Sequence, residues 1–128
     1  MTEIRILSFA AWRGGHYVGL AEVLASLGAL IEGHRWQLII DWLVSPETGA
    51  ITEAAANSLV TTNHLIDLFS GDCQLIDGEL MGYADSQPVP EVRIRAFDSG
   101  HWDVRTGNSE LLKKIIVLYP DAHELPEW

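Results

Sequence analysis

The chain has a single cysteine and no long hydrophobic run. Cys73 alone cannot form an internal disulfide, which excludes a disulfide framework and favours a reducing compartment. The longest apolar-rich run, 17–31, has 15 residues and contains Glu22, Ser26 and two glycines, so it is too short and too mixed to span a bilayer. Residues 1–5 lack the basic start and apolar region of a signal peptide. We therefore expect a soluble cytoplasmic protein.

Positive charge is absent from the middle of the sequence. The net charge is −10, and no Lys or Arg occurs between Arg35 and Arg93. Nine acidic residues lie in that stretch: Asp41, Glu47, Glu53, Asp67, Asp72, Asp77, Glu79, Asp85 and Glu91. Such a stretch is either a solvated surface that aids solubility or a negative face that steers a basic partner. In both cases the field repels phosphate backbones, so we expect no direct binding to nucleic acid.

The sequence also lacks a recognisable catalytic motif. Asp98, His101 and Asp103 lie close together, and Asp and His can ligate a metal or act as general acid and base. On a strand His101 and Asp103 would share a side, with Asp98 at a turn. Cys73 and His64 could form a nucleophile–base pair, although a lone cysteine beside an apolar strand is typical of a small core residue.

The length of 128 residues is typical of one domain, and it buries enough surface to fold without a metal or disulfide. Hydrophobic periodicity gives the order β-α-β-α-β-β-β-β-α, followed by a polar tail after residue 120. This order predicts a single α+β domain in which about three helices pack on a largely antiparallel sheet. The predicted strands are 3–9, 35–44, 73–76 and 79–84, with two more inside 91–106; the predicted helices are 16–31, one near 58–70 after an irregular or short helical segment, and 110–119.

Two β-hairpins are predicted in the second half of the chain. Asp77-Gly78 is a strong two-residue turn signal between the strands that flank it. Within 91–106, pairing Ala96 with Val104 and Ile94 with Thr106 gathers the apolar side chains on one face. That register requires a connecting loop longer than two residues.

Five tryptophans are many for this length. Trp36, Trp42 and Trp102 lie in β-prone segments and are predicted to be core residues. Trp12 lies in a connector, and Trp128 is in the polar tail. These last two either cover the edge of the core or are exposed anchors for a partner, because tryptophan is enriched in binding hot spots.

Three segments carry a resemblance to a known class of proteins. They are Asp-Gly-Glu-Leu-Met-Gly-Tyr at 77–83, Val-Arg-Ile-Arg-Ala-Phe-Asp-Ser at 92–99 and Trp-Asp-Val at 102–104. Together they resemble small acidic bacterial proteins, some of which are immunity proteins of polymorphic-toxin and contact-dependent growth inhibition systems. The resemblance covers roughly the C-terminal half. It implies a cytoplasmic protein that binds a cognate toxin domain, often a basic nuclease, and blocks its active site.

We therefore predict a non-enzymatic, acidic protein-binding inhibitor that uses no cofactor, metal, nucleic acid or membrane. Its predicted contact residues are Asp67, Asp72, Asp77, Glu79, Asp85 and Trp128. One alternative is a small enzyme or metal-binding domain that uses His101 with Asp98 or Asp103. Another is a structural subunit that self-associates through an exposed strand edge or through Trp128.

Overall fold

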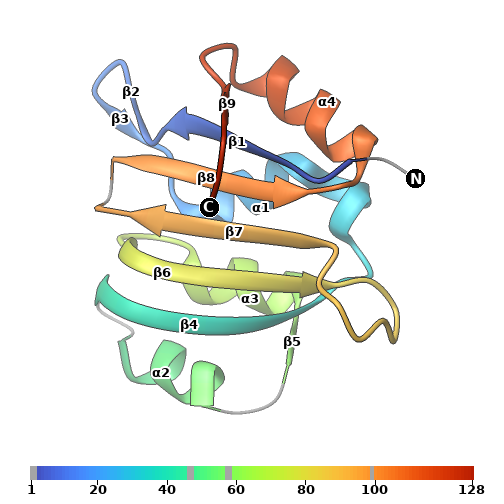
Figure 1. Cartoon of the computed structure of the whole chain (residues 1–128). Coiled ribbons are helices and arrows are strands. Elements are labelled where there is room, and N and C mark those ends of the chain that lie inside the picture. Colours follow the sequence, from blue (N-terminus) through green and yellow to red (C-terminus); the bar gives the residue numbers. More distant parts are fainter. Residues whose placement is uncertain (1–2, 46–47, 57–58, 99) are drawn as a thin grey trace.

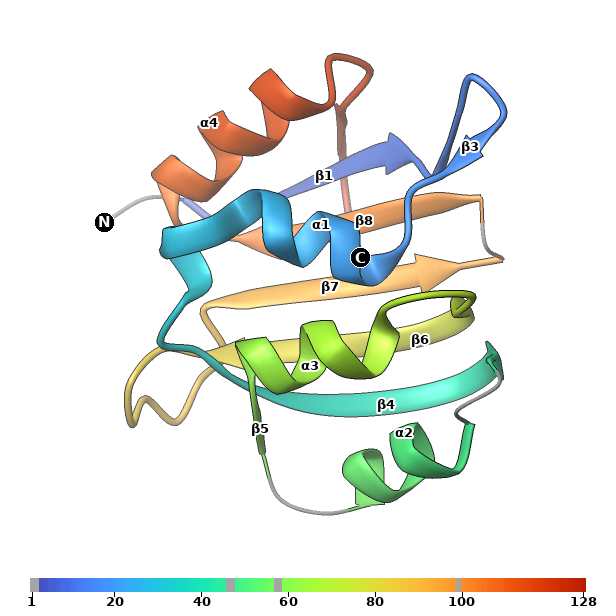
Figure 2. The ribbon, with the colours of Figure 1, turned by 180° about the vertical axis from the view of Figure 1, so that it is seen from behind.

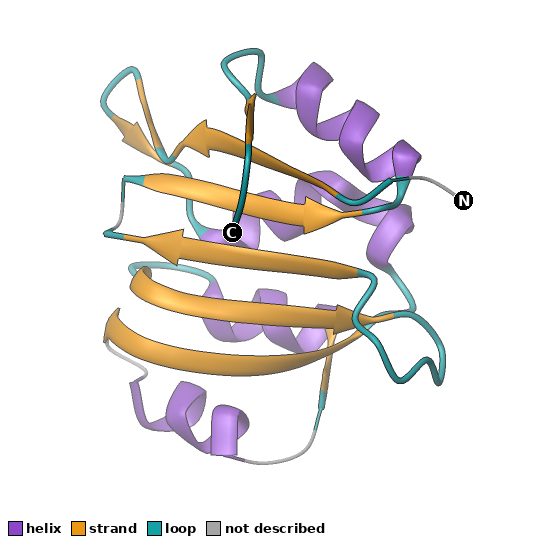
Figure 3. Cartoon of the chain, in the orientation of Figure 1, coloured by secondary structure: helices purple, strands orange, loops and turns teal. Residues whose placement is uncertain are grey.

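One antiparallel sheet of seven strands forms the centre of the molecule in the computed structural model, which describes residues 3–45, 48–56, 59–98 and 100–128. The spatial order of the strands is β5-β4-β6-β7-β8-β1-β9 (Figures 1 and 3). Their bounds are β1 (Arg5–Ala10), β4 (Arg35–Val44), β5 (Val60–Thr61), β6 (Gln74–Tyr83), β7 (Val92–Phe97), β8 (His101–Thr106) and β9 (His123–Leu125). A separate small hairpin joins β2 (Trp12–Arg13) to β3 (His16–Tyr17).

Helices cover one face of this sheet. Figure 2 shows α1 (Leu20–Leu27), α3 (Thr62–Phe69) and α4 (Ser109–Leu118) in front of the strands, whereas α2 (Thr48–Ala56) lies beside β4. A 3-10 turn, η1 (Gly28–Ile31), follows α1 directly. The predicted α+β class with a largely antiparallel sheet is therefore confirmed, with four α-helices in the described part of the chain rather than about three. No helix in the described ranges is long and apolar enough to cross a membrane.

The core lies between the sheet and the helices, and the strand register explains which residues enter it. Leu38, Leu80, Ile94, Val104 and Leu7 are cross-strand neighbours on β4, β6, β7, β8 and β1. All five are buried. Because successive strand residues point to opposite faces, the residue next to each of them points away from the helices.

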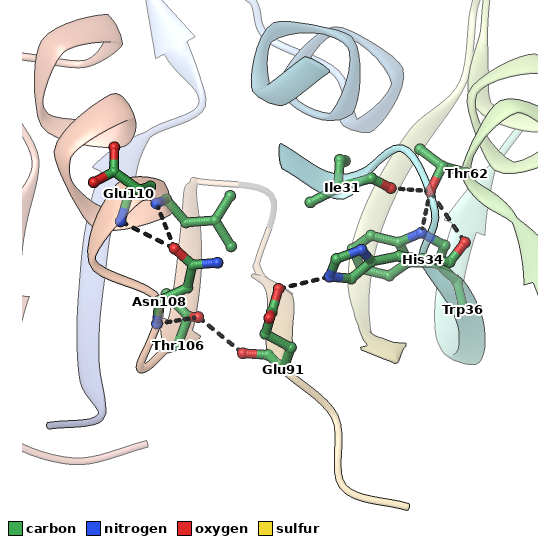
Figure 4. Close-up of polar contacts among 9 residues, drawn as sticks. Ile31, His34, Trp36, Thr62, Glu91, Thr106, Asn108 and Glu110 are labelled. Atoms are coloured by element: carbon green, nitrogen blue, oxygen red, sulfur yellow. Dashed lines mark hydrogen bonds and ion pairs between the residues drawn. The ribbon is translucent and has the colours of Figure 1, made fainter. Parts of the chain in front are cut away.

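A hydrogen-bond network ties the helix layer to the edge of the sheet (Figure 4). The Trp36 indole nitrogen donates to Thr62 Oγ1 at 2.8 Å, and Thr62 Oγ1 donates to the carbonyl oxygen of Ile31 at 2.7 Å. All three residues are buried. In the same view, His34 Nε2 lies 2.8 Å from Glu91 Oε1. The hydroxyl of Thr62 therefore pairs the buried Trp36 N–H and gives a second hydrogen bond to the Ile31 carbonyl, which also accepts the backbone N–H of His34.

Thr62→Val should lower the free energy of unfolding by about 1–3 kcal/mol, because it leaves the buried Trp36 N–H without its partner and removes one of the two hydrogen bonds that the Ile31 carbonyl accepts. Valine keeps the shape of threonine, so packing changes little. Urea unfolding followed by circular dichroism measures the effect. Thr52→Val, at an exposed position of α2, is the matched control and should change stability by less than about 0.5 kcal/mol. Equal midpoints for the two variants would contradict the assigned role of Thr62.

The predicted turn at Asp77-Gly78 is wrong, because both residues lie inside the continuous strand β6. Gly78 pairs with Ile40 on one side and with Ala96 on the other. A Cβ atom on Gly78 would lie 2.8 Å from the carbonyl oxygen of Ile39. The glycine therefore serves a close approach of two strands rather than a reversal of the chain.

The prediction that Trp42 is a core residue is also wrong, because a β-bulge precedes it. Ile40 pairs with Gly78 and Trp42 pairs with Asp77, so Asp41 is an additional residue on β4. The extra residue shifts the side chains that follow it, and Trp42 is 58% exposed instead of buried. Trp36 and Trp102 are buried as predicted, and Trp12 is exposed.

The register predicted for the β7–β8 hairpin is wrong by two residues. Ala96 pairs with Trp102, and Ile94 pairs with Val104. A shift of two keeps every side chain on its face, so burial patterns alone do not distinguish these registers. Phe97 pairs with His101, so the loop has three residues and is longer than two, as predicted. Ser99 in this loop lies outside the described residues.

The predicted and observed boundaries of the elements differ most in the first half of the chain. The predicted helix 16–31 begins only at Leu20 and becomes a 3-10 turn at Gly28, whose φ of 56° is unfavourable for residues with a side chain. The helix predicted near 58–70 is α3, which is preceded by α2 and by the short strand β5; residue 58 lies outside the described residues. The predicted polar tail contains β9, which pairs with β1.

Candidate functional site

The face of the sheet opposite α1, α3 and α4, here called the open face, carries a row of side chains that are polar except for Ile39. Ile39, Glu79, Arg95, Asp103 and Ser8 are cross-strand neighbours on β4, β6, β7, β8 and β1. Each follows or precedes a core residue by one position, so its side chain points away from the helix layer. Acidic and basic groups alternate in the middle of this row.

Two ion pairs lie on the open face. Arg93 Nη2 donates to both carboxylate oxygens of Glu79, at 2.9 and 2.8 Å. Arg95 Nη2 donates to Asp103 Oδ2 at 2.8 Å. Asp103 is only 5% exposed, so its charge depends on Arg95 for compensation.

Trp128 lies over these ion pairs. Its indole nitrogen donates to Glu79 Oε1 at 3.0 Å, and its ring centroid is 4.1 Å from the guanidinium carbon of Arg95. The guanidinium of Arg93 is 5.6 Å from the same ring. These distances are typical of cation–π contacts. Figure 1 shows how the segment after β9 reaches this position by crossing in front of β1 and β8.

The C-terminal segment is fixed to the sheet by two anchors before it reaches Trp128. Arg5 forms two hydrogen bonds with the carboxylate of Glu124, both 3.1 Å long. Asp121 accepts a hydrogen bond from the backbone N–H of Ala10 at 2.8 Å and forms an ion pair with Arg13. Partial burial by itself raises the pKa of Asp121, but the contacts with Ala10 and Arg13 outweigh it, and the pKa is lowered. The segment is therefore part of the folded structure.

A shallow groove of about 610 Å³ opens on this face beside Trp128. We call it the Trp128 groove; it is lined by Ile39, Asp41, Asp77, Gly78, Glu79, Arg95, Ala96, Phe97 and Trp128. Phe97 is 67% exposed and Ile39 is 46% exposed, so the groove has apolar walls in contact with solvent. The groove combines apolar surface, aromatic rings and carboxylates.

The carboxylates in the Trp128 groove differ in how they are compensated. Glu79 is bonded to both Arg93 and Trp128. Asp77 accepts a hydrogen bond from the backbone N–H of Asp98 at 2.9 Å, and no cation in the described ranges pairs with it. For Asp41, the described part of the chain offers neither a hydrogen bond nor an ion pair. Two negative charges of the groove therefore remain without a positive partner inside the described fold.

The structure brings together three of the six contact residues predicted from sequence. Asp77, Glu79 and Trp128 line the Trp128 groove. The other three are exposed but lie elsewhere: Asp67 on α3, Asp72 in the loop between α3 and β6, and Asp85 in the loop after β6. The six residues therefore do not form one patch.

Six lining residues of the groove were not predicted as contact residues: Ile39, Asp41, Gly78, Arg95, Ala96 and Phe97. The alternation in 92–97 already assigned Arg95 and Phe97 to the face opposite the core, and that signal was sufficient to find them. Ile39 alternates in the same way on β4. Asp41 belongs to the same alternating set as Ile39, so its place on this face also follows from the alternation in 35–44.

The alternative chemical sites find little support in the geometry. His101 and Asp103 share a side of β8 as predicted, but Asp103 is bonded to Arg95. Among the described residues, no group of three or more His, Cys, Asp or Glu side chains could hold a metal. Cys73 is buried, and this burial raises the pKa of its thiol, whereas His64 is an exposed residue of α3. A thiol with a raised pKa is a poor nucleophile.

The Trp128 groove is thus an open surface feature with apolar walls, an exposed aromatic ring and two uncompensated carboxylates. It is wide and shallow, unlike the enclosed pockets that hold small substrates. The chain matches no protein-family model, no curated protein and no solved structure, so its function is inferred from this geometry and from the sequence alone.

Proposed function

We propose that this chain is a protein-binding inhibitor, an immunity protein that binds and neutralises a cognate bacterial toxin domain in the cytoplasm. The observation that supports this proposal most is the Trp128 groove, in which Asp41 and Asp77 lie beside the exposed side chains of Ile39 and Phe97. Aromatic anchors surrounded by polar groups are typical of protein–protein interfaces.

The charge of the chain favours a basic partner. The net charge is −10, and the groove itself contains more acidic than basic lining residues. Complementary charge accelerates association and makes it sensitive to salt, which suits an inhibitor that must reach its target before damage occurs. A toxin that acts on nucleic acid has a basic substrate-binding surface, and an acidic groove is complementary to such a surface.

A co-culture experiment tests this function. A strain of the source bacterium that lacks this chain is grown in contact with its parent strain, and survival of the deletion strain is counted. We expect the deletion strain to lose viability in contact with the parent and to recover when the chain is supplied from a plasmid. Equal survival of the deletion strain with and without the plasmid would contradict the proposal.

Two charge variants then test the groove as the contact surface. Asp41→Asn/Asp77→Asn removes two charges inside the groove, and Asn at position 77 can still accept the hydrogen bond from Asp98. Asp67→Asn/Asp72→Asn removes two charges outside it. We expect the first variant to lose protection and the second to keep it, because only the first changes the groove. Similar protection by both variants would reject the groove as the interface.

A further inference from the structure

The acidic residues on the open face of the sheet differ in whether a cation of this chain pairs with them. Glu79 and Asp103 are each paired with an arginine of this chain, Arg93 and Arg95. Asp41 and Asp77 face the same groove without a cation from the described part of the chain. The fold therefore neutralises the acids at the centre of the open face and leaves those at the β4 side uncompensated.

Asp41 and Asp77 lie on neighbouring strands beside the bulge between β4 and β6. Trp42 pairs with Asp77 and Ile40 with Gly78, so Asp41 lies opposite the Asp77–Gly78 step. Asp41 follows Ile39 by two positions, so alternation places its side chain on the open face, where it lines the groove together with Asp77. Two carboxylates that line one groove repel each other. A cation entering between them would relieve this repulsion.

The other walls of the groove favour a flat cation. Phe97 presents an aromatic ring that is 67% exposed, and Ile39 adds exposed apolar surface. Arg95 already lies 6.0 Å from the Phe97 ring on one side, which shows that this ring accepts a guanidinium. Arginine is planar, stacks on aromatic rings and bridges carboxylates with two hydrogen bonds, whereas lysine presents a compact and strongly hydrated charge.

We propose that the Trp128 groove receives an arginine side chain of the partner protein, with its guanidinium between Asp41 and Asp77 and against the ring of Phe97. This inference rests on the proposed function for the nature of the partner, but the recognition chemistry can be tested without any toxin. In this interface, the partner's arginine supplies the positive charge that the described fold does not place beside Asp41 and Asp77.

N-acetyl-arginine amide is the probe, and its neutral isostere N-acetyl-citrulline amide is the control. Each is titrated into the isotopically labelled full chain while the backbone amides and the Trp128 indole N–H are followed by nuclear magnetic resonance. We expect saturable shifts confined to Asp41, Gly78, Phe97 and Trp128 with the arginine probe and none with citrulline. Shifts spread evenly over all exposed acids, or no saturable shift, would overturn the proposal.

The same charge variants complete the test. Asp41→Asn/Asp77→Asn should weaken binding of the arginine probe by about fivefold or more, because two charge contacts in the groove are lost. Asp67→Asn/Asp72→Asn has the same net charge and should bind as the unmodified chain does. Equal weakening in both variants would show a general charge effect and overturn the site. Equal binding of N-acetyl-lysine amide would overturn the assignment to arginine.

The two experiments can fail independently. The probe titration contains no toxin, and the co-culture contains no probe. Localised arginine binding without protection would contradict the inhibitor function and leave the arginine site in place. Protection without localised arginine binding would overturn the arginine site and leave the inhibitor function in place.

Discussion

Gly82→Ala is expected to lower the free energy of unfolding by about 2–3 kcal/mol, because the added methyl group has no room. Its Cβ atom would lie 2.8 Å from two carbons of the Trp36 ring and 2.9 Å from Val92 Cγ1. Trp36 is fully buried and is held by its hydrogen bond to Thr62, so the ring cannot move away without breaking that contact.

Urea unfolding followed by tryptophan fluorescence measures this change. Gly33→Ala is the control, since a Cβ atom there would meet nothing within 4 Å. Alanine also restricts the unfolded chain more than glycine does, which favours the folded state slightly in both variants. The control should therefore be neutral or slightly stabilised. A Gly82→Ala protein as stable as the control would show that the Trp36 ring has space to shift.

Arg95→Met is expected to destabilise the fold by about 3 kcal/mol, because it leaves the buried carboxylate of Asp103 without compensation. Arg95 also supports the ring of Trp128 at 4.1 Å, so the variant loses a cation–π contact as well. The expected result is a lower denaturation midpoint together with increased solvent exposure of Trp128, seen as a red shift of its fluorescence.

Two further variants separate charge from packing. In Arg95→Met/Asp103→Leu both partners are apolar, and we expect most of the lost stability to return, because no buried charge remains unpaired. Arg5→Met tests an exposed pair instead. The side chains of Arg5 and Glu124 are 41% and 50% exposed, so the loss of their ion pair should cost much less stability than Arg95→Met does. A double variant as unstable as Arg95→Met alone would mean that packing, and not charge, dominates at this site.

Local patterns in the sequence identified elements whose partners are close in the chain. The alternation in 92–106 predicted the β7–β8 hairpin, and it placed Trp102 in the core correctly. The same reasoning predicted β4 with its observed bounds. A period of two is a property of one strand, so it can be read without knowing the neighbouring strands.

The errors occur where the outcome depends on a neighbouring strand. Asp77-Gly78 has the composition of a tight turn, yet Gly78 is flanked by β4 and β7, and backbone pairing on both sides keeps β6 continuous. Trp42 is exposed because of a bulge that exists only when β4 pairs with β6. No window of local sequence contains this information.

The candidate site was only partly predictable for the same reason. Asp77 and Glu79 share a face because they are two positions apart on β6, but the turn predicted at Asp77-Gly78 hid this relation. Trp128 joins them only because β9 pairs with β1 and directs the chain across the open face. Asp67, Asp72 and Asp85 are near Asp77 in sequence, but none of them lines the groove. Asp67 is on α3, and the other two are in the loops before and after β6.

The position of β1 has a consequence for how the chain folds. β1 lies between β8 and β9, and Leu7 pairs with Val104 on one side and with Glu124 on the other. During synthesis on a ribosome, β1 therefore has no sheet partner until β8, at residues 101–106, has been made. Contacts between such distant residues close slowly, because the intervening loop must be ordered first. We expect the local β7–β8 hairpin to form early and docking of β1 to be the late step that completes the open face.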